Sequence, residues 1–164
     1  MHPSGFDSEF FDVRVSPAGH RFWIDGLGAV LERTGEMGGE FLGEVTGAHG
    51  AVRMAVVSVA GQTIELLEYR NVQGEQGSSR PYDPGFAHLA FEVDNIDAVL
   101  TRIADFGWTA QGTPQPIAGG AKVGTRVIYA VSPHGKNIDV HVGMLTDHRD
   151  GTGDVFAYGF GVED

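Results

Sequence analysis

Two acidic residues and one histidine in this 164-residue chain stand where they can do metal-ion or proton-transfer chemistry. Glu65 and Asp139 each lie between two large aliphatic residues on a predicted strand. Side chains alternate along a strand, so each acid faces away from its aliphatic neighbours. A lone carboxylate is rarely buried, so each acid either faces solvent or shares a ligand inside the protein. The recurrence of the same acid in the same setting favours the shared ligand.

His88 is the third candidate, near the beginning of another predicted strand, between Ala87 and Leu89. A single histidine there is more often a hydrogen-bonded core residue than a ligand. With two carboxylates, however, it makes a donor set that suits a divalent first-row metal ion or a hard cation. The chain has no cysteine, which excludes a thiolate site. His141 shares a strand face with Asp139 and is a fourth ligand, a proton shuttle or a strand-end histidine; we favour the last.

The elements that must position these residues occur in the same order in both halves of the chain. In the second half we expect a strand, a helix and three strands, at residues 86–93, 96–106, 108–111, 126–131 and 137–142. In the first half we expect a strand, a helix from Pro17 towards Gly26 and three more strands, the strands at residues 10–15, 29–33, 52–59 and 63–69. Residues 38–50 read as an inserted loop with a short helical piece.

The two halves also match residue by residue. Residues 61–66, Gly-Gln-Thr-Ile-Glu-Leu, parallel residues 135–140, Gly-Lys-Asn-Ile-Asp-Val, and residues 10–15 parallel residues 88–93. A duplicated module explains these matches better than one continuous fold does. We therefore predict an α+β protein of two βαβββ modules. The predicted boundaries are residues 9–70 for the first module, 71–85 for a linker, 86–143 for the second module and 144–164 for a C-terminal tail.

Composition and charge exclude several classes of protein. The net charge of −11 argues against nucleic acid as a partner, because such binding depends on Lys and Arg meeting phosphates. It is compatible with a cationic ligand, although a soluble acidic surface is the commoner cause. No stretch of the sequence is long and apolar enough to span a membrane, and residues 1–9 do not resemble a secretory signal. We therefore expect a cytoplasmic protein.

Four segments carry a family resemblance. Residues 22–28 read Phe-Trp-Ile-Asp-Gly-Leu-Gly, residues 64–69 read Ile-Glu-Leu-Leu-Glu-Tyr, residues 86–97 read Phe-Ala-His-Leu-Ala-Phe-Glu-Val-Asp-Asn-Ile-Asp, and residues 132–139 read Ser-Pro-His-Gly-Lys-Asn-Ile-Asp. In this order, over residues 10–143, they resemble motifs of the vicinal oxygen chelate superfamily, which includes glyoxalases, bleomycin-resistance proteins, dioxygenases and methylmalonyl-CoA epimerases. The resemblance implies curled mixed sheets around a shared cavity, and a homodimer.

The resemblance also implies a metal site built from a histidine of the first strand and an acid of the last strand of each module. Carried onto this chain, three of these positions fall on Glu65, His88 and Asp139, so Glu65 and His88 should share one coordination sphere. The fourth falls on Phe10, which cannot bind a metal ion. Water or His141 would then complete the coordination.

From the resemblance we expect a metal-dependent isomerase, epimerase or lyase that acts through an enolate on a small oxygen-chelating metabolite. A divalent ion (Zn, Ni, Co, Mn or Fe) would act as Lewis acid, and Asp139 or Glu65 would be the general base. The alternative is a protein of the same fold that binds a drug or metabolite without metal, which the loss of the first-strand histidine favours. A third reading is an enzyme that uses acid–base chemistry alone.

Overall fold

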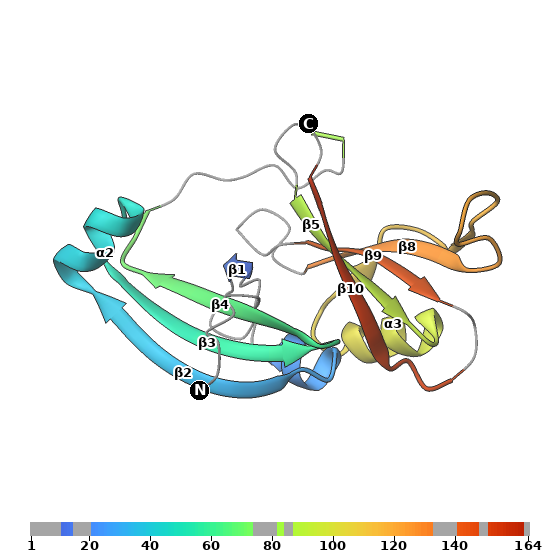
Figure 1. Cartoon of the computed structure of the whole chain (residues 1–164), viewed down its shortest axis with the longest axis horizontal. Helices are drawn as coiled ribbons and strands as arrows, with labels where there is room; N and C mark the ends of the chain where they lie inside the picture. The colour runs from blue at the N-terminus through green and yellow to red at the C-terminus, as the bar shows by residue number, and fades with distance from the viewer. Residues whose placement is uncertain are drawn as a thin grey trace, which may run out of the picture.

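Two curved β-sheets and short helices make up the protein (Figure 1). The computed structural model describes residues 11–14, 21–73, 82–83, 87–132, 141–147 and 151–162. For residues 11–14, 87, 141–147 and 158–162 it describes the backbone alone. Figure 1 shows β2, β3 and β4 curling along their length, with the second sheet beside them.

The first sheet has four strands in the order β1-β4-β3-β2. β1 runs parallel to β4, and the remaining pairs are antiparallel. The β3–β4 turn places Ala60 and Gly61 at φ of 52° and 75°, the left-handed conformation that a two-residue type I′ hairpin needs. The strand bounds are Phe11–Arg14 (β1), Val30–Gly38 (β2), Ala51–Val59 (β3) and Gln62–Arg70 (β4).

The second sheet has the strand order β10-β5-β9-β8-β6, with β7 also paired to β8. β5 runs parallel to β9 and antiparallel to β10. The strand predicted at residues 137–142 differs: β9 begins at His141 and continues to Asp147, and residues 133–140 lie outside the described part of the chain. The bounds are Ala87–Val93 (β5), Thr109–Ala110 (β6), Gln115–Pro116 (β7), Arg126–Val131 (β8), His141–Asp147 (β9) and Val155–Val162 (β10).

The two sheets share one topology. In each, the first strand of the module pairs in parallel with the last, and the third strand pairs antiparallel to the last. The predicted α+β fold of two βαβββ modules with curled mixed sheets is confirmed. β10 is an addition from the C-terminal tail, on the edge of β5. The boundaries at residues 9–70, 71–85, 86–143 and 144–164 stay predictions.

The helices differ from the prediction at their ends. α3 (Ile96–Ala104) begins where expected, because the side chain of Asn95 accepts a hydrogen bond from the backbone N–H of Ala98 at 3.1 Å. Bonds between residues three apart then close the turn down to Gly107, so the helix ends before Phe106. η1 (Phe22–Gly26) is a single π-helical turn, with residues 15–20 outside the described part. α2 (Gly39–Thr46) is the short helical piece expected within residues 38–50.

One hydrophobic core joins the two modules. Phe22 of η1 stacks on Trp108 with ring centroids 4.0 Å apart, and Trp23 packs edge-on against Phe91 of β5. The core also takes the inner faces of β3, β4, β5 and β8 and the buried face of α3. Because residues from both halves fill it, neither module is expected to keep its packing alone. Among the described residues, no helix is long and apolar enough to cross a membrane.

Candidate active site

The face of β4 that turns away from the core carries Glu65. Ile64 and Leu66 are buried in the core, so alternation turns Glu65 to the opposite face, where it is half-buried. Its neighbour across the β3–β4 pair is Val56, which is only 3% exposed. Its neighbour across the β1–β4 pair is Asp12. Glu65 is therefore a carboxylate on a partly covered, apolar surface, unlike an ordinary solvated acid.

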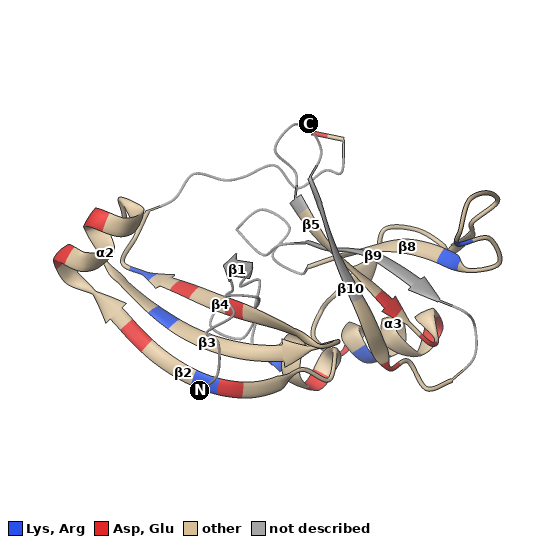
Figure 2. Ribbon diagram, in the orientation of Figure 1, with Lys and Arg blue, Asp and Glu red and all other residues tan. Residues whose placement is uncertain are grey.

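Glu68 lies three residues further along β4. It lies on the other face of the strand, where its carboxylate meets Arg70 at 3.1 Å and Arg53 at 4.0 Å. Arg53 also approaches Glu36 of β2 at 3.6 Å. Figure 2 shows these acidic and basic positions alternating across β2, β3 and β4. The side chain of Glu68 is only 12% exposed, so the two arginines compensate a largely covered carboxylate.

His88 lies on the corresponding face of β5. Leu89, Phe91 and Val93 are buried in the core, which turns His88 to the opposite side of the sheet. Its side chain is nevertheless only 7% exposed, and no other ionisable side chain in the described part of the chain is buried. Burying an imidazole is unfavourable without compensating interactions. His88 is thus a buried imidazole on the face opposite the core, and its role as a ligand stays a prediction.

Tyr129 of β8 is a site residue that sequence reasoning missed. Its neighbours Ile128 and Ala130 are buried in the core, so Tyr129 projects from the same face as His88. The two rings meet edge to face, with centroids 5.4 Å apart and planes at 67°. The alternation of residues 126–131 could have indicated the face of Tyr129. Its contact with His88 depends on β5, β9 and β8 lying side by side, which alternation does not predict.

The backbone brings two further positions beside His88. Its partner on β9 is His141, and its partner on β10 is Gly161. The side chain of His141 lies outside the described residues, so its role as ligand, proton shuttle or strand-end residue stays open to test. The tail, for which the sequence carried no functional signal, thus supplies the strand next to the candidate histidine.

An ion pair lies further along the same face of β5. Glu92, four residues from His88, pairs with Lys122, which comes from the connection between β7 and β8. The pair ties this glycine-containing connection to β5. Sequence reasoning missed it because the two residues are far apart in the chain and neither belongs to a recognisable charge pattern.

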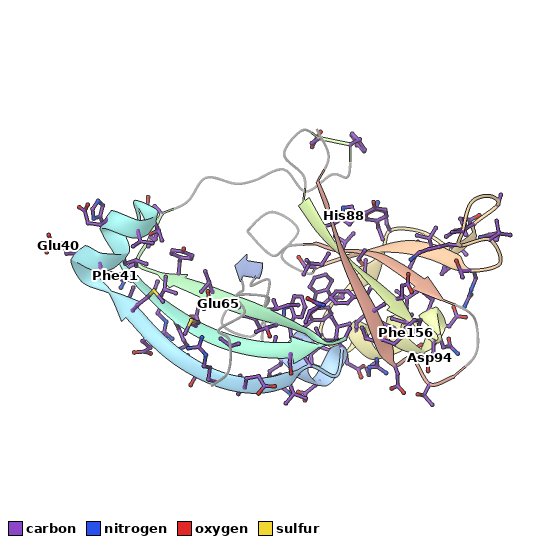
Figure 3. All side chains as sticks on the ribbon, in the orientation of Figure 1. Glu40, Phe41, Glu65, His88, Asp94 and Phe156 are labelled. Atoms are coloured by element: carbon purple, nitrogen blue, oxygen red, sulfur yellow. The ribbon has the colours of Figure 1, made fainter. Side chains whose placement is uncertain are left out.

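The two predicted metal ligands that the structure describes come from different sheets. Glu65 lies in the first sheet and His88 in the second (Figure 3). In the described ranges, no group of three or more His, Asp or Glu side chains is close enough to hold a metal ion. Asp139 and Phe10 lie outside the described residues. A joint site of Glu65, His88 and Asp139 therefore stays a prediction.

The strand register also bears on the missing first-strand ligand. Asp12 pairs with Glu65 in the first sheet, and His88 pairs with His141 in the second, at the same separation along the chain. When residues 61–66 are matched to residues 135–140, this register makes Arg14 the equivalent of His88. The sequence repeat instead makes Phe10 the equivalent of His88, four residues earlier. β1 contains no histidine, so the first module lacks this ligand under either alignment.

Comparisons with known proteins agree with this fold. Residues 17–140 match the family model of the glyoxalase/bleomycin resistance protein/dioxygenase superfamily. A glyoxalase family protein from Bacillus cereus is 20% identical with a TM-score of 0.65, covering 84% of this chain and 90% of its own. One from Enterococcus faecalis is 16% identical with a TM-score of 0.55, covering 84% and 93%. The fosfomycin resistance protein FosX of Listeria monocytogenes, solved with Mn(II) and sulfate, is 18% identical with a TM-score of 0.52, covering 89% and 93%. No curated protein matches the sequence.

Proposed function

The chain belongs to the glyoxalase/bleomycin resistance protein/dioxygenase superfamily, and from this membership we propose that it is a metal-dependent isomerase, epimerase or lyase. Its substrate is a small metabolite with two neighbouring oxygen atoms that chelate the ion. The reaction passes through an enolate, so a group beside the substrate must take a proton from carbon. The residues proposed for this work are Glu65, His88 and Asp139.

The burial of His88 is the observation that carries the proposal. The side chain is 7% exposed on the face of β5 opposite the core, where a leucine or valine would be the ordinary occupant of a covered position. Tyr129 fixes one side of the ring. A buried, oriented imidazole that the core does not need is typical of a ligand or a proton-transfer group.

The three residues divide the chemistry between them. His88, Glu65 and Asp139 are the proposed ligands of a divalent ion, of Zn, Ni, Co, Mn or Fe type, that would act as a Lewis acid when bound. Imidazole and carboxylate donors suit such ions, and FosX of Listeria monocytogenes was solved with Mn(II). Glu65 or Asp139 is the proposed general base. The partial burial of Glu65 beside Val56 would help to keep water from the proton that it takes.

A second candidate function is a protein that binds a drug or metabolite in the same fold without a metal ion. One observation favours it: β1, Phe11–Arg14, contains no histidine, whereas β5, the corresponding strand of the second module, contains His88. In that case Glu65 and His88 would hydrogen-bond to the ligand directly. A homodimer is proposed for either function.

Metal content of untagged protein separates the two functions. The metal enzyme is expected to hold about one divalent ion per chain by elemental analysis, and the variant His88→Ala to lose it. His49→Ala is the matched control, since His49 lies in the loop after α2, beside Gly43, and should leave the metal content unchanged. A parent protein that binds none of the five metals on titration would refute the metal enzyme and leave the metal-free binding protein.

A further inference from the structure

A cleft lies where η1, the β3–β4 turn, α3 and the beginning of β10 meet. Its volume is about 570 Å³, within the range of sites that hold small molecules. We propose that this cleft binds a small zwitterion, a molecule of the amino-acid class that carries an ammonium and a carboxylate group on an apolar body. The inference concerns a second site and does not depend on the proposed enzyme.

The walls of the cleft are apolar. Leu27 and Val59 belong to the shared core, are 2% and 6% exposed, and form a fixed floor. Val155 adds a half-buried side chain from the tail, and Val30 contributes a side chain that is 59% exposed. An aliphatic ligand body would remove apolar area of Val30 from water, which is favourable by about 25 cal/mol for each Å² buried.

Arg102 offers a positive group at a fixed position. Its Nε donates a hydrogen bond to the carbonyl oxygen of Gly26 at 2.6 Å, and its Nη2 donates one to the carbonyl oxygen of Gly153 at 2.9 Å. These two bonds hold the guanidinium between the first module and the tail. They use only two of its five N–H groups, so others remain to meet a ligand carboxylate along the cleft.

Two carboxylates also line the cleft. Asp25 is exposed and makes only a long ion pair with Arg21, at 3.7 Å between exposed groups. The side chain of Asp154 is exposed at the beginning of the tail strand. Figure 2 shows acidic and basic positions on η1 and α3, the helices that flank this junction. A ligand ammonium would therefore find a negative partner in the same cleft that offers Arg102 to its carboxylate.

Both charges on the ligand are needed for this argument. A simple carboxylate would meet Arg102, but also Asp25, Asp154 and the field of a protein with a net charge of −11. A simple amine would pair with the carboxylates but would offer no negative group to the guanidinium of Arg102. The zwitterion satisfies both signs, and its apolar body covers the valine wall.

This cleft is separate from the candidate active site. Val155 lines it at the beginning of β10, whereas Gly161, six residues further along the same strand, is the partner of His88. At about 3.3 Å per residue, the two sites are roughly 20 Å apart. A cleft lined by both modules and the tail also lets its ligand influence how these parts pack together.

Binding can be tested without any knowledge of the enzyme reaction. The probes are the apolar L-amino acids at about 10 mM, a concentration that detects a Kd in the millimolar range. Two analogues of L-leucine lack one charged group each: 3-methylbutylamine lacks the carboxylate, and 4-methylpentanoate lacks the ammonium group. We expect at least one amino acid to raise the Tm and to titrate in calorimetry. Each analogue should bind about tenfold more weakly than L-leucine, as the loss of one charged hydrogen-bonded contact implies.

Two tryptophan variants locate the binding. Val30→Trp should fill the cleft and abolish the Tm shift, whereas Leu31→Trp, at a neighbouring residue that is 46% exposed and does not line the cleft, should keep it. Asp154→Asn should weaken binding. Asp105→Asn should not, because Asp105 is an exposed residue at the C-terminal cap of α3 that does not line the cleft. The proposal is overturned if no amino acid shifts the Tm, if Val30→Trp binds as well as the parent, or if the amine binds as tightly as L-leucine.

Discussion

Replacing Phe22 tests whether the two modules share one core. Phe22 is 2% exposed and stacks on Trp108, which is 5% exposed, at a centroid distance of 4.0 Å. Truncation of a buried phenylalanine to alanine costs about 3–5 kcal/mol through lost transfer energy and the cavity that remains. Because a domain is typically stable by about 5–15 kcal/mol, Phe22→Ala should remove about a fifth or more of the free energy of unfolding.

The expected fall in Tm follows from the same figure. A domain of this size loses about 2–4 °C for each kcal/mol, so Phe22→Ala should lower the Tm by roughly 6–20 °C. The control is Phe41→Ala on α2, where the ring is 64% exposed. Its effect should stay within about 0.5 kcal/mol, as for other surface positions.

The assay is urea unfolding followed by tryptophan fluorescence. The chain has two tryptophans, Trp23 in the first module and Trp108 in the second, and Trp23→Phe and Trp108→Phe leave one reporter each. If the core is shared, Phe22→Ala should shift the midpoint seen by both reporters equally. A transition that moves only for Trp23, or two separate transitions in the parent, would refute the shared core.

Three further predictions follow from the backbone and the register. In Gly153→Ala the new Cβ would lie 3.0 Å from the Cβ of Ala98 at a φ of +93°, so urea unfolding should show a loss of roughly 1–3 kcal/mol, against almost none for Gly119→Ala, which has no neighbour within 4 Å. If the first module lacks a ligand as the register indicates, Arg14→His should tighten Zn, Ni or Co binding in calorimetry, whereas the sequence repeat predicts this for Phe10→His; no gain in either variant would count against a metal site. Light scattering at low micromolar concentration should give the mass of a dimer, because open sheet edges invite pairing, and a monomer mass would contradict this.

Local patterns were enough to predict the elements that are closed by their own neighbours. The β3–β4 hairpin was predictable because two alternating segments flank Ala60 and Gly61, which adopt the required positive φ. α3 was predictable because Asn95 caps it and Ile96, Val99 and Ile103 share one apolar face. The match between the two halves then predicted the module order, and the sheet topology confirms it.

Contacts between distant segments could not be predicted in the same way. The sequence predicts only a tail at residues 144–164. The place of β10 beside β5 depends on contacts at the turn before it, where Asp94 accepts hydrogen bonds from the backbone of Thr152 and Gly153. Likewise, the pairing of Lys122 with Glu92 depends on how the connection between β7 and β8 folds over the sheet. Neither contact leaves a periodic trace in the sequence.

The same distinction between local patterns and contacts of distant segments applies to the candidate site. Alternation alone was enough to turn Glu65 and His88 away from the core, since their flanking residues are apolar. The residue of β1 that pairs with Glu65 depends on the register between β1 and β4. These strands are parallel and joined by a long connection, so no hairpin turn sets their register. A slip by an even number of residues keeps every side chain on its face and changes only its partner. The repeat could therefore predict the face of the missing ligand, while its identity, Phe10 or Arg14, depends on the pairing of Asp12 with Glu65.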